Sequence, residues 1–446
     1  MLGAIHSADG QLSRLLDFRQ EVYDRLGKGR DALFDLMDAN LCTRSIESLA
    51  ELSLSPVFRR GWPSTYEAVQ DGEVPGKELM PLYCAQMSGE LRPVLAGDHT
   101  AWPGPQARTL ADRTIEHQPT SVPGNRPITI GHGYSTLAWV PDESGSWALP
   151  LLHERIGTAE SPITKAAAQL REVCEALPKE RPPVALYDSE YGCAPFVLAT
   201  ADIAAVKVMR LRPNMCLWAP PPEYSGRGRP REHGDKFKLS DATTWPQADD
   251  TLEVEEPELG PVRVQLWLGL HLRKAKGQTL SLIRIERLNA KGTRRDPKGL
   301  WLGWLGEEAP SLPEDWRLYL RRFAVDHWYR FAKQRLHWTE PQLGTPERSQ
   351  TWSNLVVLMT WQLFLGRGVL EDKPLPWQAT VKKMTPGRAC QAWGSLLARI
   401  GTPAQVPKPR AKSPGWPKGR VRKRRDVHPV VKKANKRRKT TATTAD

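Results

Sequence analysis

The sequence has 446 residues, enough for two or three domains, and its 40% hydrophobic content with 17 Trp indicates a folded chain. Of its net charge of +14, nearly all lies in residues 404–446, which hold 15 Lys and Arg against two Asp. Six scattered Cys without a C-x-x-C pair argue against a structural zinc site and a disulfide scaffold. The N-terminus has no signal-peptide pattern and the most apolar run, 355–365, is too short to span a bilayer, so we expect a cytoplasmic protein with no membrane partner.

The first 90 residues are predicted to be mainly helical. Apolar residues recur at helical intervals in 12–26 and 33–37, and turn residues at 53–56 separate the later segments. Ser64 is expected to cap a short helix at 65–70. Short helices broken by tight turns are typical of a helix-turn-helix DNA reader, and they fit a helical cap or dimerisation region equally well. We therefore predict a DNA-binding or dimerisation region at 1–90.

From residue 91 the pattern changes to strands. The pattern predicts three strands, a helix, a strand, a second helix and a fifth strand, at 93–100, 127–140, 147–156, 161–177, 183–188, 194–205 and 207–211. Ser161 is the expected N-cap of the first helix, with Pro162 as its first residue. Asp98 and Asp188 each end an apolar strand, so we expect them to lie beside each other at one sheet edge. These elements form the first part of a core, at 91–212.

The remaining chain divides into an insertion, a second part of the core and a basic tail. Residues 213–313 begin with a Pro/Gly/Arg-rich loop at 220–231, and strand-like pieces follow at 251–255, 262–272, 279–288 and 300–305. The core is expected to resume at 314–401, with helices at 348–365 and 389–400. Pro and Lys then dominate, so 402–446 is predicted to be disordered. Such a polycation suits salt-sensitive contact with nucleic acid as well as a solubilising end.

One stretch in the second part of the core, 319–333, has no Gly or Pro and separates polar from apolar residues at helical spacing. Its polar residues fall within an arc of about 80° on one helical face. They are Tyr319, Arg322, Asp326, Arg330 and Lys333. Taken alone, this pattern fits a solvated face with i,i+4 ion pairs as well as it fits a functional site.

The order and spacing of Tyr319, Arg322, Asp326 and Lys333 resemble the signature of DDE-type insertion-sequence transposases, in which the acid is Glu. Residues 98–100 resemble the first conserved block of that family, and Asp188 with a Tyr three residues later resembles the second. The resemblance implies an α/β, RNase H-like core, a mixed sheet flanked by helices and interrupted by a β-rich insertion. It also implies that Asp98, Asp188 and Asp326 are catalytic and hold two Mg2+ or Mn2+ ions, for which hard carboxylate oxygens are suitable ligands.

The resemblance further implies contacts with DNA. Arg322, Arg330 and Lys333 are expected to meet phosphates near the scissile bond, and Tyr319 is expected to stack on or hydrogen-bond to DNA. Residues 226–231 separately resemble an AT-hook core that lies in a narrow minor groove, through Arg227, Arg229 and Arg231. A flexible basic loop is the alternative interpretation of that motif.

These features predict a DNA transposase of an insertion sequence. It would bind the terminal inverted repeats of its element, cleave at their 3′ ends and join them to target DNA, as a homodimer in the synaptic complex at the nucleoid. Two alternatives remain open. One is a catalytically inactive or repurposed transposase that acts as a DNA-binding protein, and the other is an RNase H-like nuclease without strand transfer.

Overall fold

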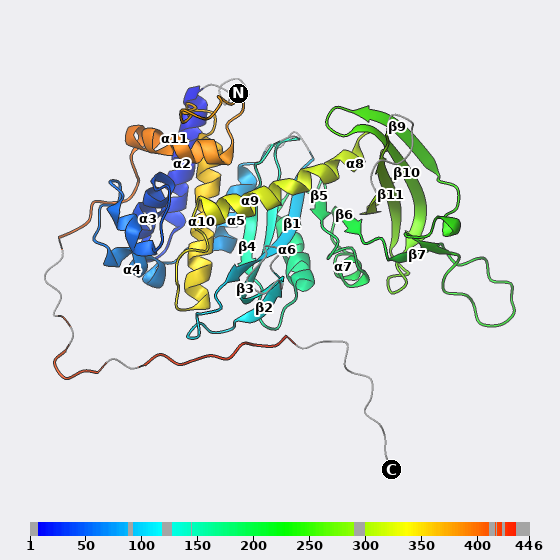
Figure 1. The fold of residues 1–446 in the computed structure, drawn as a ribbon, viewed down its shortest axis with the longest axis horizontal. Coiled ribbons are helices and arrows are strands. Elements are labelled where there is room, and N and C mark those ends of the chain that lie inside the picture. The colour runs from blue at the N-terminus through cyan, green and yellow to red at the C-terminus, as the bar shows by residue number, and fades with distance from the viewer. Residues whose placement is uncertain are drawn as a thin grey trace, which may run out of the picture.

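The computed structural model describes residues 8–87, 92–117, 127–143, 145–289, 299–409, 415, 417–421 and 424–433. The fold is mixed α/β and is built on one sheet of 12 strands, with helices packed against it (Figure 1). The parts of the predicted N-terminal region and basic tail at 1–7, 88–90, 410–414, 416, 422–423 and 434–446 lie outside the described residues. The predicted domain boundaries themselves stay predictions.

The core strands have the order β4-β3-β1-β5-β6. Their bounds are β1 (Val94–Pro103), β3 (Ile128–Trp139), β4 (Leu149–Arg155), β5 (Val184–Tyr187) and β6 (Val206–Leu211). Strand β3 is antiparallel to β1 and β4, whereas β5 is parallel to both β1 and β6. All four residues of β5 are buried, as expected for a parallel strand covered on both faces. This arrangement is consistent with an RNase H-like core.

Two helices connect these strands, α6 (Pro162–Ala176) and α7 (Ala194–Ala199). Helix α6 begins as predicted, because Ser161 and Thr164 form a capping box and Pro162 is its first residue. The predicted succession of three strands, helix, strand, helix and strand is therefore confirmed, although α7 is shorter than expected. Strand β2 (Thr114–His117), which pairs with β3, was not predicted.

The predicted insertion continues the core sheet. Its strands are β7 (Cys216–Trp218), β8 (Lys236–Lys238), β9 (Asp250–Glu256), β10 (Gly260–His271), β11 (Thr279–Arg287) and β12 (Leu300–Leu305), and a short helical turn, η2 (Ala242–Thr244), follows β8. Strand β12 pairs antiparallel with β6, and the sheet continues through β11, β10, β7 and β8. The rings of Phe237, Trp245, Trp267 and Trp301 pack together within this part. The insertion thus has an aromatic core of its own and an unbroken hydrogen-bonded link to β6.

Three helical segments follow without a gap: α8 (Asp315–Leu318), η3 (Tyr319–Arg322), which is a 3-10 turn, and α9 (Phe323–Gln334). Together they run across β1 from the insertion towards the helices at the other end of the molecule (Figure 1). The predicted signature helix therefore exists, with its first four residues wound more tightly than an α-helix. Helix α9, which carries Asp326, packs against β1.

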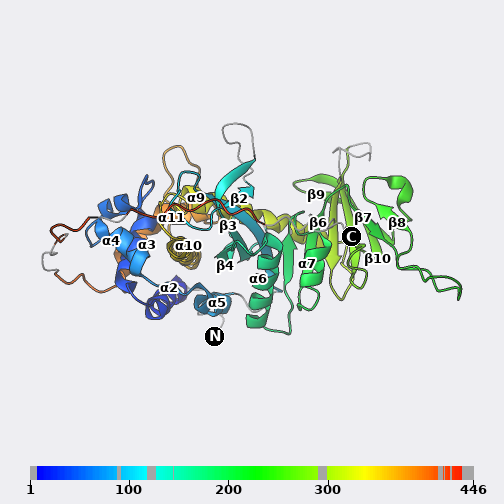
Figure 2. The same cartoon turned by 90° about the horizontal axis from the view of Figure 1, so that it is seen from below.

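The remaining helices enclose one central helix, α10 (Pro346–Gly366). The others are α2 (Ala8–Arg25), α3 (Arg30–Cys42), η1 (Leu49–Leu54), α4 (Pro63–Asp71), α5 (Gly76–Ala85) and α11 (Pro386–Ile400). Helix α10 contacts α2, α3, α4 and α11 as well as β4, which explains why it is apolar around its whole circumference. Figure 2 looks along α10, with α2 and α3 on one side and the sheet on the other. Ser64 does not cap α4, because that helix begins at Pro63 with Trp62 as its N-cap.

Two further features concern surfaces. No helix among the described residues is long and apolar enough to cross a membrane. In the tail, residues 428–433 lie against the edge formed by β2, where disorder was predicted. Figure 1 shows this segment in red, running below β2 and β3.

Candidate active site

Asp98 and Asp188 lie next to each other on parallel neighbouring strands. The register pairs Gly97 of β1 with Tyr187 of β5, so the next residues along the two strands are the two aspartates. Neighbouring strands are about 4.8 Å apart, and paired residues of a parallel ladder point to the same face of the sheet. The two residues are therefore neighbours, as expected, but only Asp188 follows the end of its strand. Asp98 lies in the middle of β1, because β1 continues to Pro103 through its pairing with β3.

The other face of this strand pair is sealed by aromatic rings. The ring of Tyr187 crosses directly over Gly97, where an added Cβ would stand 2.1 Å from a ring carbon. Tyr187 also packs against Tyr191 and Phe196, and all three are fully buried. Gly97 therefore leaves the space that Tyr187 needs to close the core beneath the carboxylates.

Arg322 joins the third acid to the first. Its guanidinium donates to Asp98 Oδ2 at 3.3 Å and to Asp326 Oδ2 at 3.1 Å. The side chains of Arg322 and Asp98 are 11% and 13% exposed, whereas that of Asp326 is 47% exposed. The three predicted acids are thus brought together around one buried cation, with Asp326 on the solvent side.

The electrostatics of Asp98 are dominated by burial. Burial, together with the charge of Asp188, raises the pKa of Asp98 to about 7, although Arg322 and the backbone N–H of His99 act in the opposite direction. That N–H donates to Asp98 Oδ1 at 2.7 Å. The carboxyl of Asp188 accepts the N–H of Glu190 at 2.9 Å. The site therefore holds concentrated negative charge that is only partly compensated by Arg322.

Two residues further along α9 fix β1 from the helix side. The hydroxyl of Tyr329 donates to the backbone oxygen of Asp98 at 3.0 Å and lies 2.8 Å from Thr136 Oγ1. Lys333 donates to Thr100 Oγ1 at 2.8 Å, and burial lowers the pKa of its ammonium group to about 8. Lys333 thus lies at the carboxylate site, two residues along β1 from Asp98.

The predicted DNA-binding residues fall into different environments. Tyr319 is 4% exposed and lies with its ring beside the guanidinium of Arg322, so its expected contact with DNA stays a prediction. Arg330 is exposed on α9. Arg227, Arg229 and Arg231 are exposed in the loop between β7 and β8, on the insertion and apart from the carboxylates (Figure 1).

Some residues of the site were given no role from the sequence, although Tyr191 was part of the resemblance. His99 lies with Nδ1 3.1 Å from the hydroxyl of Tyr191 and Nε2 3.7 Å from Glu190 Oε2. Tyr329 was also missed. His99, Glu190 and Tyr191 belong to the short blocks that follow Asp98 and Asp188, so those blocks contained the signal.

The structure allows a test of whether the acids suit a divalent metal. The donors are carboxylates, and the unfavourable charge of Asp98 beside Asp188 is what a bound cation would relieve. Within the described part of the chain, no three His, Cys, Asp or Glu side chains are close enough to hold one ion together. Asp98 and Asp188 thus supply oxygen donors of the kind a divalent metal prefers, and Asp326 would have to leave Arg322 to join them.

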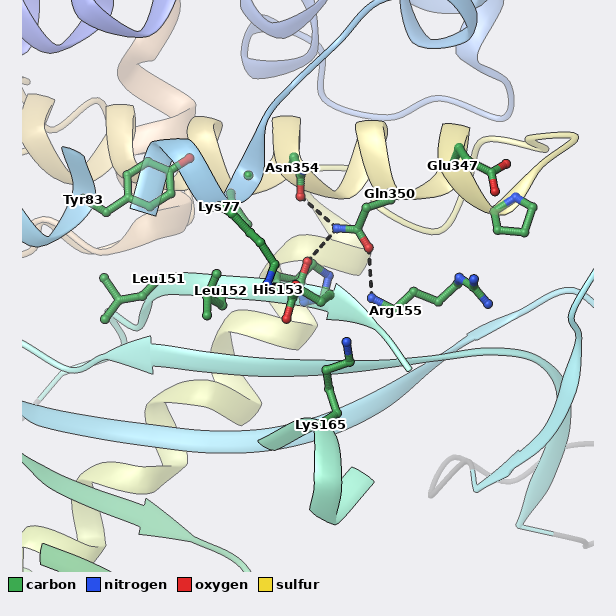
Figure 3. A pocket seen from close by; sticks show the side chains of 14 residues that line it. Lys77, Tyr83, Leu151, Leu152, His153, Arg155, Lys165, Glu347, Gln350 and Asn354 are labelled. Carbon is green, nitrogen blue, oxygen red and sulfur yellow. Dashed lines mark hydrogen bonds and ion pairs between the residues drawn. The ribbon is translucent and has the colours of Figure 1, made fainter. Parts of the chain in front are cut away.

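A separate pocket of about 390 Å3 lies between α5, β4 and α10. Its wall includes Lys77, His153, Arg155 and Gln350 (Figure 3). The Gln350 side chain donates to the backbone oxygen of His153 and accepts from the backbone N–H of Arg155, at 2.8 and 2.9 Å. None of the predicted site residues lines this pocket. The hydrogen bonds of Gln350 join α10 to β4, and the pocket is not part of the carboxylate site.

The order and directions of the core strands are consistent with an RNase H-like core. A family model described as DDE superfamily endonuclease matches residues 21–267, which is more than half of the sequence, and the chain belongs to this family. The matched region contains Asp98 and Asp188 and ends before Asp326. No curated protein matches this sequence.

Proposed function

We propose that this protein is the transposase of an insertion sequence. Its substrates would be double-stranded DNA carrying the terminal inverted repeats of the element, and target DNA. It would cleave DNA and transfer the strand, and the joining of two ends requires at least a homodimer. The observation that carries this proposal is the placement of Asp98 and Asp188 on adjacent strands, with Arg322 linking Asp98 to Asp326.

The three acids would hold Mg2+ or Mn2+. In a two-metal site the ions activate the attacking oxygen and stabilise the leaving oxygen of the phosphodiester. Asp98 and Asp188 are held by their strands and by the N–H groups of His99 and Glu190. The side chain of Asp326 is half exposed and pairs with Arg322 on the solvent side, so it is the acid that can change partners.

Arg322 has a second task in this proposal. A planar guanidinium binds phosphate oxygens in the same paired geometry in which it binds carboxylates. When Asp326 leaves Arg322, the guanidinium is free to contact a phosphate at the scissile bond. Lys333 and the exposed Arg330 would contact phosphates further along the same side of α9. The loop with Arg227, Arg229 and Arg231 would contact flanking DNA through the insertion.

The test is metal-dependent cleavage and joining of DNA that carries the element's own ends. The wild type would be compared with Asp326→Asn and Asp326→Glu in Mg2+ and in Mn2+, with Glu340→Gln as an exposed acid outside the site. We expect an active wild type, at least a 100-fold loss in Asp326→Asn and no change in the control. Cleavage without joining would favour an RNase H-like nuclease. Binding of the ends without cleavage by the wild type or the Glu variant would favour a repurposed DNA-binding protein.

A further inference from the structure

The segment 426–433 of the C-terminal tail, here called the tail segment, is bound along the turn and strand at 108–116. The N–H of His428 donates to the Arg108 carbonyl at 2.9 Å, and the N–H of Val431 donates to the Arg113 carbonyl at 2.7 Å. Val431 forms a parallel bridge with Thr114, the first residue of β2. The tail segment therefore adds to the sheet edge through its backbone, which is how extended peptides bind many proteins.

Two buried charged side chains of the body depend on this contact. Arg113 is 4% exposed and uses its guanidinium to donate to the carbonyls of Leu110, Pro105 and His428, at 3.2, 3.3 and 3.0 Å. Glu116 is 7% exposed, and its Oε1 accepts a hydrogen bond from Lys433 Nζ at 3.2 Å. Burying a charge is costly unless the charge is paired and hydrogen-bonded. Arg113 and Glu116 are thus buried with the tail segment in place, and each has a partner in that segment.

The adjacent residues Lys432 and Lys433 of the tail segment lie in different environments. Lys433 is half-buried against Glu116, whereas Lys432 is exposed, and so are Arg424 and Arg425 just before the segment. Strand β2 joins β3 at Gly131, which also pairs with Pro103 at the end of β1. Pro103 is five residues beyond Asp98, about 17 Å along the strand. The tail segment therefore lies along the sheet edge at the Pro103 end of β1, the strand that carries Asp98.

We propose that residues 108–116 form a binding groove for the chain's own C-terminal segment, a basic peptide in extended conformation with a lysine for Glu116. Docking in this groove holds the exposed cations of the tail in position to bind the phosphates of a DNA duplex beside the carboxylates. This second step rests on the proposed function, whereas the docking itself does not.

Glu116→Gln separates docking from simple charge. The substitution removes a negative charge, so charge alone predicts tighter binding of DNA, whereas loss of docking predicts weaker binding. Amide hydrogen exchange of residues 427–433 would be measured on the full chain without DNA. We expect exchange to be at least tenfold faster in Glu116→Gln and in Lys433→Ala, and unchanged in Lys432→Ala.

Binding of a mixed-sequence DNA duplex would then be measured against salt concentration. We expect a severalfold weaker affinity for Glu116→Gln, and a slope of log affinity against log salt that is smaller by about 0.9 for Lys432→Ala. Val431→Pro removes the N–H that binds Arg113 and lies in the tail, so it tests docking without disturbing the folding of the body. Unchanged exchange in both Glu116→Gln and Val431→Pro would overturn the groove. Faster exchange with tighter binding of DNA would overturn the positioning of the cations, and a wild type with protected amides that binds no DNA would refute the proposed function alone.

Discussion

Asp98 is a buried carboxyl whose chemistry is set by three neighbours, Asp188, Arg322 and the backbone of His99. Its strand is fixed from below by the ring of Tyr187 and from the helix side by Tyr329. Such over-determined positioning keeps the oxygen atoms of a buried acid in one place. Asp326 lacks these constraints, so its side chain has more conformational freedom than that of Asp98.

Gly97→Ala should destabilise the protein by about 3 kcal/mol, because a Cβ at this position collides with the Tyr187 ring and overpacks a filled core. The measurement is urea unfolding followed by Trp fluorescence. Gly387→Ala is the matched control, since an added Cβ in α11 meets nothing within 4 Å, and a gain of up to about 1 kcal/mol is expected. Equal midpoints for the two variants would show that Tyr187 can move aside.

His153 should make the protein sensitive to acid. Burial and the nearby charge of Lys333 lower the pKa of His153 to about 3, so the folded protein holds it neutral. Below about pH 6.5 the unfolded chain takes up a proton that the folded chain excludes, and stability should fall by about 1.4 kcal/mol per pH unit until the pH approaches 3. Burial also lowers the pKa of His337, to about 4, and adds an effect of the same sign.

The contribution of His153 can be isolated by variants. Urea midpoints at pH 7, 6 and 5 should decline less steeply in His153→Gln than in the wild type. His327→Gln, on an exposed position of α9, should keep the wild-type slope. A wild-type slope in His153→Gln would mean that other groups cause the acid sensitivity.

Among the elements, α2 and α3 are joined by a buried ion pair that also hydrogen-bonds to α10. Arg19 of α2 and Asp38 of α3 are 2.9 Å apart with side chains 2% and 3% exposed, and Arg19 also donates to Gln362 of α10. Asp38→Asn should cost about 3–5 kcal/mol, because it leaves a buried guanidinium without its counter-charge. Glu21→Gln, which breaks the exposed pair between Glu21 and Arg25, should cost less than about 1 kcal/mol in the same unfolding assay. Similar losses in both would indicate that Arg19 finds another partner.

The signature helix shows how far periodicity alone can predict a site. The helical spacing of Asp326 and Lys333 holds in the structure, because both lie in α9, which is a regular helix. Tyr319 lies in a 3-10 turn, in which each residue rotates about 120° instead of 100°, so it is shifted by roughly 60–80° from the predicted face. The spacing also could not show that Arg322 binds both acids, since that depends on the depth of burial and not on helical angle.

The strands were predictable where they form a continuous apolar run. Val184 to Tyr187 is a continuous apolar run and was found, together with the acid that follows it. Strands β7 and β8 have three residues each and exist through pairing with each other, so they carry no periodic signal. The bound tail was missed for a similar reason. Its composition predicts disorder, and its contacts depend on Arg113 and Glu116, more than 300 residues earlier.

At the scale of the molecule, the insertion and the core share one sheet. The pairing of β12 with β6 means that the loop with Arg227 is carried by strands that are hydrogen-bonded, strand by strand, to the core. The predicted division at 213 and 313 therefore marks a change in sequence pattern more than a break in the fold. Strand pairing could not be deduced from the alternating pattern, which identifies strands but not their neighbours.

The position of α10 late in the sequence has a consequence for folding during synthesis on the ribosome. Helix α2 is made first, yet it packs on α10, whose first residue is about 320 positions later. At typical translation rates this interval lasts roughly 15–65 s. Throughout that time α2 lacks its contacts with α10, although Phe18 can pack against Tyr83 once α5 has been made. A product that stops before α10 leaves that side of α2 uncovered, so it should aggregate or be degraded more readily than the full chain.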